Sequence, residues 1–264
     1  MKLSDYIVQF LVSQGIKHAF VIIGGASVHM IDSLAKNSEI DYVCAQHEQA
    51  SAMMADAYSR VTGNLGAAIS TSGPGATNMI TGTCCSYYDS IPVLYLTGQV
   101  ATFRLKGDRG IRQLGFQETD TIEIFKPITK YSVMIRDSSM IRYELEKAVY
   151  IAKSGRPGPV LVDIPDDLQR EDINPDTLRS YIPETETVVE IGMGEKISEC
   201  IRLINQSKRP AIVLGWGVRL SKAEKEALHF PMLMVLTSMF ILENGKTINC
   251  MDKEKLNFQK ITQK

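Results

Sequence analysis

The chain has 264 residues, of which 44% are hydrophobic, and its 29 lysines and arginines balance 30 aspartates and glutamates. This length and composition predict one large or two modest domains with a hydrophobic core, and they exclude a wholly disordered chain. The formal net charge of -1, without a dense basic run, argues against binding to nucleic acid or to an acidic membrane.

The sequence also carries no pattern for a membrane span or a secreted protein. No apolar stretch is long enough to cross a bilayer, and the N-terminus lacks the shape of a signal peptide. The 5 cysteines form no C-x-x-C pair and the 4 histidines no H-E-x-x-H motif, which argues against a disulfide scaffold and a zinc cluster. We therefore expect a cytoplasmic protein whose reduced cysteines pack as small hydrophobic residues.

Helical and strand patterns alternate along the first 165 residues. Ser4 is placed to cap the first helix, which Gly15 ends. A long helix is predicted from about Gln49 to Thr62, where Gly63 stops it. Buried strands are predicted at residues 18–23, 40–45, 65–71, 92–97, 128–135 and 159–164. This alternation predicts an α/β fold with a doubly wound, mainly parallel six-stranded sheet covered by helices on both faces.

The second part of the chain is less regular. Residues 98–118 carry several basic side chains and glycines, which is typical of a surface loop, and residues 166–192 are polar and acidic, as in a linker. A helix at about 195–205, a strand at 211–214 and a possible strand at 232–236 then begin a new βα pattern that fades at about 240. The start of a second α/β domain is the prediction for this part.

Two glycine-containing strings join a predicted strand to a helix. Gly24-Gly25-Ala26-Ser27 gives a ligand access to the backbone beside a helix N-terminus, although such a turn can also serve geometry alone. It is not G-x-G-x-x-G, so a dinucleotide fingerprint is not supported. The string from Ser72 to Asn78, with Gly73-Pro74-Gly75, is rigid and poor in side chains; it suits either a flat ligand or a tight connection.

Three further features have two interpretations each. Glu48 follows a predicted strand, so its carboxylate is expected at the sheet edge where ligands bind, unless it caps the following helix. The string Phe116-Gln117-Glu118 fits a pocket lining or the start of a helix. The basic residues of 104–112 fit an anionic substrate or, more simply, a solvated loop.

Taken together, these strings resemble the pyrimidine-binding (PYR) domain of thiamine diphosphate enzymes, closest to the acetolactate synthase (acetohydroxyacid synthase) group of carboligases. Residues from about 190 to 237 resemble the opening of that family's central domain. The resemblance predicts a PYR domain at 1–167, a linker at 168–192 and an incomplete central domain with a divergent tail at 193–264. The matching strings, in the family's order, are Gly24-Gly25-Ala26, His47-Glu48-Gln49-Ala50, Thr71-Ser72-Gly73-Pro74-Gly75-Ala76-Thr77-Asn78, Asp89-Ser90-Ile91-Pro92, Thr97-Gly98-Gln99-Val100, Phe116-Gln117-Glu118 and Gly155-Arg156-Pro157-Gly158-Pro159-Val160.

The resemblance assigns roles to residues of this chain. Glu48 would be the catalytic glutamate that hydrogen-bonds the cofactor's pyrimidine ring and assists proton removal from its thiazolium carbon. Further residues would shape the pyrimidine side of the cofactor site: Ser72, Gly73, Pro74, Gly75 and Asn78. The residues that would face the reacting end and the substrate are Gly25, Phe116 and Gln117.

The chain also departs from the family's pattern. The family binds the cofactor's diphosphate and Mg²⁺ in a third domain through a Gly-Asp-Gly string, which is absent here, so we expect no metal ligands in this chain. The stretch between Gln99 and Phe116 is longer than in the family, which leaves the substrate open, and a flavin (FAD) site in the central domain is open as well.

The predicted function is therefore the pyrimidine-binding portion of a thiamine diphosphate-dependent 2-oxo acid carboligase or decarboxylase, inactive without a diphosphate-binding domain. Its expected partners are further copies of itself or a diphosphate-binding subunit. Alternatives are the PYR-type subunit of a split decarboxylase and a non-catalytic assembly module of the same fold. A generic nucleotide-binding domain is disfavoured because G-x-G-x-x-G is absent.

Overall fold

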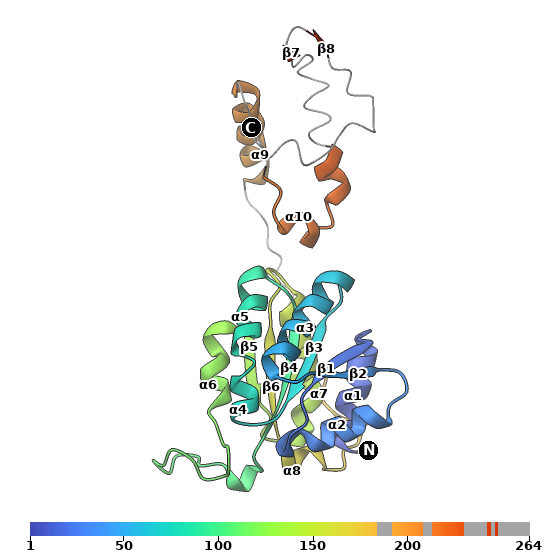
Figure 1. Ribbon diagram of the computed structural model, residues 1–264, viewed down its shortest axis with the longest axis vertical. Coiled ribbons are helices and arrows are strands. Elements are labelled where there is room, and N and C mark those ends of the chain that lie inside the picture. The colour runs from blue at the N-terminus through green and yellow to red at the C-terminus, as the bar shows by residue number, and fades with distance from the viewer. Residues whose placement is uncertain (184–191, 208–212, 230–241, 244–245, 248–264) are drawn as a thin grey trace. The chain divides into compact units, whose positions relative to one another are not determined.

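The computed structural model describes residues 1–183, 192–207, 213–229, 242–243 and 246–247 (Figure 1). The chain divides into two compact units, residues 1–187 and 188–264, and each is described by itself. The first unit includes part of the segment 168–192 that the sequence assigns to a linker. The functional boundaries at 167/168 and 192/193 stay a prediction.

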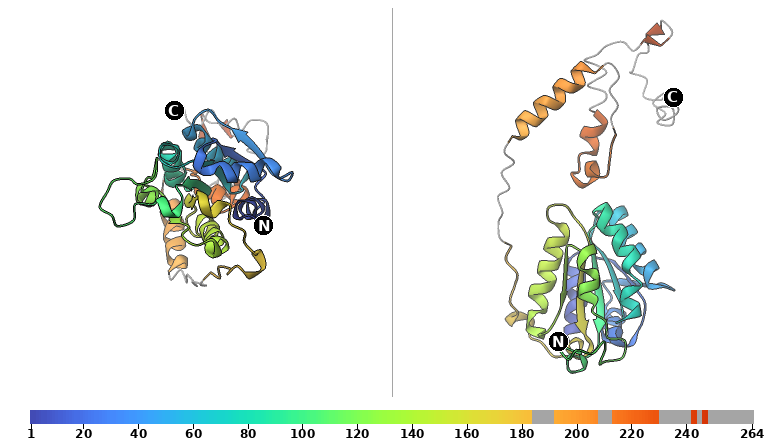
Figure 2. Two further views of the ribbon diagram at one scale, coloured as in Figure 1. Left: turned by 90° about the horizontal axis from the view of Figure 1, so that it is seen from below. Right: turned by 90° about the vertical axis from the view of Figure 1, so that its left-hand side faces the viewer.

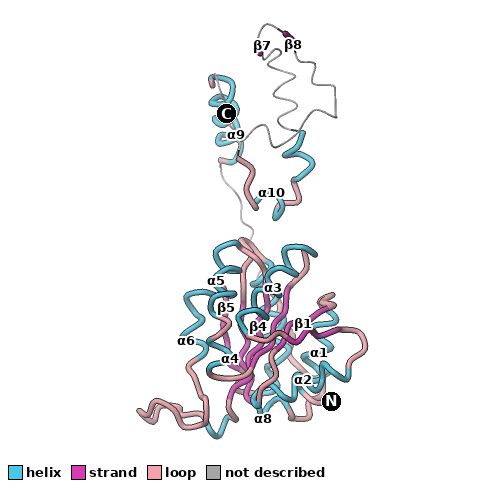
Figure 3. The backbone as a smooth tube through the Cα atoms, viewed as in Figure 1, coloured by secondary structure: helices cyan, strands magenta, loops and turns pink. Residues whose placement is uncertain are grey.

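The first unit is built around a six-stranded sheet in the order β2-β1-β3-β4-β6-β5, in which every strand pairs in parallel. Figure 3 shows its strands in magenta among the cyan helices. The predicted doubly wound parallel sheet is confirmed. Because β2 lies on one side of β1 and β3 on the other, the strand order reverses between β1 and β3. The strands are β1 His18–Val21, β2 Asp41–Cys44, β3 Gly66–Ser70, β4 Val93–Gln99, β5 Tyr131–Met134 and β6 Val160–Pro165.

Helices cover both faces of this sheet (Figure 2). On one face lie α1 Leu3–Ser13, α2 Val28–Lys36, α7 Ile141–Lys153 and α8 Asp166–Gln169. On the other lie α3 Glu48–Thr62, α4 Pro74–Thr77, α5 Ile80–Asp89 and α6 Thr121–Phe125. Every residue of β3, β4 and β6 is buried, as expected for parallel strands between two helical layers.

Small residues let α3 approach its neighbours closely. A Cβ on Gly66 of β3 would lie 2.1 Å from the Ala55 carbonyl oxygen, and a Cβ on Gly82 of α5 would lie 2.4 Å from Cβ of Ala52. Only glycine fits at these two contacts without displacing the helix. The predicted end of α3 is confirmed, because Gly63 follows it in the left-handed conformation with φ 72°. The first turn of α3, which carries Glu48, is thus built on a closely packed helix.

Two local predictions were wrong. Ser4 does not cap α1: Lys2 holds that position, and Ser4 is buried inside the helix, where its hydroxyl accepts from Ser33 Oγ at 2.9 Å. The cysteines do not all pack as core residues, since Cys44 and Cys85 are exposed in the first unit. Cys44 lies on β2, an edge strand with all four residues exposed.

The second unit contains α9 Met193–Gln206 and α10 Gly217–Leu220, together with β7 Leu242–Glu243 paired antiparallel to β8 Lys246–Thr247. The predicted helix at about 195–205 is confirmed by α9. Residues 213 and 214 are not in a strand, contrary to the prediction for 211–214, while 211–212 and the whole of 232–236 lie outside the described residues. None of the helices described in either unit has the length and apolar character needed to cross a membrane.

Candidate functional site

The predicted site residues follow strands whose carboxyl ends meet at one edge of the sheet. The loop containing η1, Gly25–Ser27, follows β1, α3 begins after β2 at Glu48, and the string 72–78 follows β3. The two glycine-containing loops therefore flank the reversal of strand order between β1 and β3. Ligands of open parallel sheets bind at such a switch point, outside the carboxyl ends of the strands.

Glu48 is partly buried, and its carboxylate is held from the neighbouring loop. The Asn78 side chain donates from Nδ2 to Glu48 Oε2 at 2.9 Å. Capping of α3 falls to His47, whose Nδ1 accepts from the Gln49 N–H at 3.1 Å. Glu48 thus occupies the first turn of the helix while its side chain reaches across to the loop after β3.

Gly75 lies against this carboxylate. A Cβ at this position would be 3.4 Å from Glu48 Oε1 and 2.7 Å from the Thr71 methyl group. Thr71 also joins the two loops, because its Oγ1 accepts from the Ala26 N–H at 3.1 Å. No role for Thr71 was predicted from the sequence; its place directly after a buried strand was the signal available.

Gly73 and Gln117 meet through their backbones. Gly73 has φ 57°, and a Cβ on it would lie 2.6 Å from the Gln117 carbonyl oxygen. Gln117 itself has φ 61°, which is unusual for a residue other than glycine and costs about 1–3 kcal/mol. The string after β3 is therefore in contact with both Glu48 and Gln117, as a shared site requires.

The remaining predicted residues lie in different surroundings. Ser72 is buried, and Pro74 is the exposed first residue of α4. A Cβ on Gly25 would meet no atom within 4 Å, and the Phe116 side chain is 85% exposed. Gly25 and Phe116, which the sequence predicts on the substrate side, thus present open surface in this chain.

The basic loop before Phe116 is closed at its base by Glu118. The buried Glu118 carboxylate accepts N–H donors from Lys106 at 2.7 Å, Leu114 at 2.8 Å and Gly115 at 3.3 Å. Lys106 Nζ also donates to Asp120 at 2.6 Å. Sequence reasoning placed Glu118 in the string but did not foresee that it organises the loop, because its partners lie up to 12 residues away.

A buried carboxyl group lies at the carboxyl end of β6. Asp163 pairs directly with Thr97 in the register of β4 and β6 and accepts from Thr97 Oγ1 at 2.6 Å and from Gln99 Nε2 at 2.9 Å. Gln99 Nε2 also donates to the Thr119 carbonyl at 3.0 Å. Burial raises the pKa of Asp163 to about 7, and these hydrogen bonds oppose the shift. Asp163 thus connects the sheet to the backbone two residues beyond Gln117.

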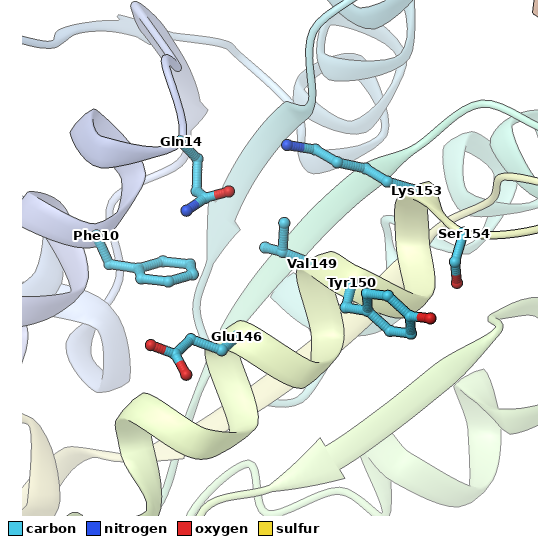
Figure 4. A pocket seen from close by; sticks show the side chains of 7 residues that line it. All are labelled: Phe10, Gln14, Glu146, Val149, Tyr150, Lys153 and Ser154. Carbon is cyan, nitrogen blue, oxygen red and sulfur yellow. The ribbon is translucent and has the colours of Figure 1, made fainter. Parts of the chain in front are cut away.

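A separate concavity of about 410 Å³ opens between α1 and α7 (Figure 4). It lies near the carboxyl ends of α1 and α7, which precede β1 and β6. It is therefore near the amino ends of these strands, away from the edge that carries Glu48. Burial lowers the pKa of Lys153 in its wall. The lining residues are Phe10, Gln14, Glu146, Val149, Tyr150, Lys153 and Ser154.

Within the described ranges, no group of three or more His, Cys, Asp or Glu side chains is arranged to hold a metal ion. The edge near Glu48 fits a flat, uncharged heteroaromatic ring better. One carboxylate oxygen is fixed by Asn78, and the other lies beside Gly75, where a Cβ would be 3.4 Å from it. A carboxyl group next to bare backbone can share a proton with a nitrogen of such a ring.

Comparison with known proteins shows which proteins this chain resembles. Residues 1–124 match the family described as "Thiamine pyrophosphate enzyme, N-terminal TPP binding domain". The match spans less than half of this chain, and it agrees with the sequence resemblance to thiamine diphosphate enzymes.

The chain is more particularly similar to acetolactate synthase large subunits. It is 38% identical to that of Buchnera aphidicola subsp. Acyrthosiphon pisum over 230 residues, which are 84% of this chain and 38% of that protein. It is 36% identical to the acetolactate synthase isozyme 3 large subunit of Escherichia coli over 253 residues, 89% of this chain and 42% of that protein. A probable large subunit of Methanocaldococcus jannaschii is 38% identical over 86% of this chain. The chain spans less than half the length of these relatives.

The first prediction concerns Asp163. Its pKa of about 7 in the folded chain exceeds the value of about 3.9 expected when unfolded. The folded chain therefore binds more protons between about pH 4 and pH 7, so this group's contribution to stability is complete below pH 4 and is lost as the pH rises toward 7. The loss is at most roughly 4 kcal/mol.

Asp163→Asn imitates the protonated side chain, since the Thr97 hydroxyl can accept from the amide while Gln99 still donates to its oxygen. Urea unfolding at several pH values should show the wild type losing stability relative to Asp163→Asn as the pH rises from 4 to 7. Asp108→Asn, at an exposed position, controls for the loss of one carboxylate. If the difference in the free energy of unfolding between the wild type and Asp163→Asn were constant across this range, the raised pKa of Asp163 would be contradicted.

Proposed function

We propose that this chain is the pyrimidine-side portion of a thiamine diphosphate-dependent enzyme that joins or decarboxylates 2-oxo acids. The observation that carries the proposal is the Glu48 carboxylate, held by Asn78 beside Gly75 at the switch point of the sheet. The similarity to acetolactate synthase large subunits supports the same proposal, because those relatives are named as synthases of acetolactate.

Each residue of the cluster has a distinct task in this proposal. Asn78 fixes one oxygen of Glu48, so that the other is oriented rather than free to rotate. Glu48 then binds a ring nitrogen of the pyrimidine and holds or accepts its proton, an assistance worth typically about 10² to 10⁴ in rate. Gly75 keeps the space before the carboxylate free of side chains. When bound, thiamine diphosphate supplies the carbon nucleophile that such a reaction needs.

The opposite wall of the site would be formed by the loop after β1 and by the strained Gln117. Gly25 offers open backbone, and Gln117 is held at a fixed position by its contact with Gly73. We assign these residues, with Phe116, to the reacting end of the cofactor and to the 2-oxo acid. The exposed state of Phe116 suits a surface that a second protein region covers.

The cofactor's diphosphate and Mg²⁺ belong, in this proposal, to a region other than the described part of this chain. The described residues offer no cluster of metal ligands, and the basic loop is an exposed rather than a built site. The cytoplasmic location stays a prediction, and the use of a flavin stays open.

The second prediction tests Glu48 through contact with the cofactor. In saturation-transfer NMR with the full chain, thiamine diphosphate should show its strongest transfer at the pyrimidine protons. Glu48→Gln keeps the size of the side chain but removes its charge, and a hydrogen bond to a charged group is worth about 1.5–3 kcal/mol, so the contact should weaken about tenfold or more. Glu39→Gln, at an exposed position, is the matched control. Equal transfer to wild type and Glu48→Gln would remove Glu48 from the cofactor site.

The third prediction is that the chain alone binds thiamine diphosphate weakly. The pyrimidine side offers one charged hydrogen bond and backbone contacts, against an association cost of several kcal/mol at least. Calorimetric titration with the cofactor and Mg²⁺ should therefore give a dissociation constant of about 1 mM or weaker, with no release of carbon dioxide from pyruvate. Micromolar binding would show that a diphosphate site has been missed, and the loop from Arg104 to Arg112 would be examined first.

The fourth prediction concerns association of two copies through α3. Its outer surface exposes Met53 and Met54, and the neighbouring α5 exposes Cys85 and Tyr88. Apolar, flexible side chains of this kind suit an interface. Analytical ultracentrifugation should show a concentration-dependent dimer that Met54→Glu weakens at least about tenfold, because it buries a charge.

Ile182→Glu is the control for this experiment. Ile182 is 80% exposed, and the adjoining Tyr181 packs on Tyr143 and Tyr150 of α7, on the opposite face of the sheet. Its substitution should leave association unchanged. A wild-type chain that stays monomeric at high concentration would count against the α3 interface.

A further inference from the structure

Gln169 joins the last helix of the first unit to the loop after the first strand. Its Nε2 donates to the Ala26 carbonyl at 2.7 Å and to the Ile164 carbonyl at 2.8 Å. The first of these bonds spans 143 residues, and the Gln169 side chain is fully buried. One amide group therefore ties the loop beside Gly25 to the carboxyl end of β6.

The Ala26 peptide is held from two further directions. Its N–H donates to Thr71 Oγ1 at 3.1 Å, so the loop is tied to the residue that follows β3. Its carbonyl lies over Gly98 of β4, where a Cβ would be only 2.0 Å from the oxygen. Gln169 thus completes a hold on the Ala26 backbone from three sides.

The carbonyl oxygen of the Gln169 side chain helps to distinguish a positioning role from a purely stabilising one. Its Oε1 is buried and has no hydrogen-bond partner among the described residues. An unpaired buried acceptor is unfavourable, so an apolar side chain of the same size would avoid that cost. What the glutamine adds is its pair of donors, and both are directed at backbone carbonyls of the carboxyl edge.

We propose that Gln169 is a positioning residue that fixes the Gly24–Ser27 loop, and with it the open backbone of Gly25, at the ligand side of the sheet. This rests on the proposed function in assigning Gly25 to the reacting end of the cofactor. Gln169 acts through Ala26 and does not itself touch the ligand. Two neighbours on the same segment act similarly on the end of β4 and the residues after it: Asp163 accepts from Gln99 Nε2, and Asp167 accepts from the Thr102 N–H at 3.0 Å.

Amide hydrogen exchange of the full chain tests this without any cofactor. Gln169→Met retains the length of the side chain and removes both donors. The amides of Ala26 and Ser27 should lose protection by about tenfold, while those of β3 and β4 stay within about twofold of the wild type. Arg170→Met places the same new side chain at the adjoining exposed position and should change neither group.

Gln169→Glu supplies a second, reversible variant. Its carboxyl group carries a donor only when protonated, so protection of Ala26, normalised for the intrinsic exchange rate, should recover toward the wild-type value at acidic pH. Gln169→Met should show no such recovery. If Gln169 served only to stabilise the fold, its replacement would also lower the protection of β3 and β4 to the same extent at every pH. That result, or unchanged protection at Ala26 and Ser27, would overturn the proposal.

The two proposals fail in different experiments. If the wild-type chain shows no pyrimidine contact in the NMR experiment, the proposed function is wrong, yet the exchange result at Ala26 is unaffected. If thiamine diphosphate contacts the wild type and Gln169→Met equally while the loop loses protection, the hold on the loop is irrelevant to binding and the positioning role is overturned.

Discussion

Backbone contact at glycine residues is the constraint on which the whole carboxyl edge depends. Gly66 lets α3 lie on β3, which places the first turn of that helix near the sheet. Gly75 and Gly73 then let the loop after β3 contact Glu48 on one side and Gln117 on the other, and Gly98 admits the Ala26 peptide. A Cβ at any of these positions would push apart the segments that meet there. The hydrogen bond from Asn78 to Glu48 is a consequence of this packing.

Local patterns in the sequence were enough to predict the elements that carry the site. The strands are short apolar runs bounded by turn residues, and α3 ends at a glycine with positive φ, so both could be recognised without long-range information. The position of Glu48 followed from the same reasoning, because a residue after a parallel strand must lie at the carboxyl edge. The roles of Glu48 and Asn78 came from the family resemblance, and spacing alone left the cap interpretation open.

The parts that could not be predicted depend on contacts between distant residues. Nothing near Gln169 in the sequence indicates that it reaches Ala26, and nothing near Asp163 indicates a bond to Gln99. The same holds for the loop that Glu118 closes from within. Ser4 is an example of a local pattern that misled: serine is a common helix cap, but here it lies inside α1, where its hydroxyl has a buried partner in Ser33.

The central claim is that the edge between β1 and β3 receives the pyrimidine ring. It is tested most directly by titrating the isotope-labelled full chain with thiamine, which lacks the diphosphate, and following backbone amide chemical shifts. The account predicts progressive changes that concentrate at residues 24–26, 47–49 and 72–78, with the concavity between α1 and α7 unaffected. Shifts confined to residues of that concavity, such as Gln14 and Lys153, or no shifts at the β1–β3 edge at high thiamine concentration, would contradict it.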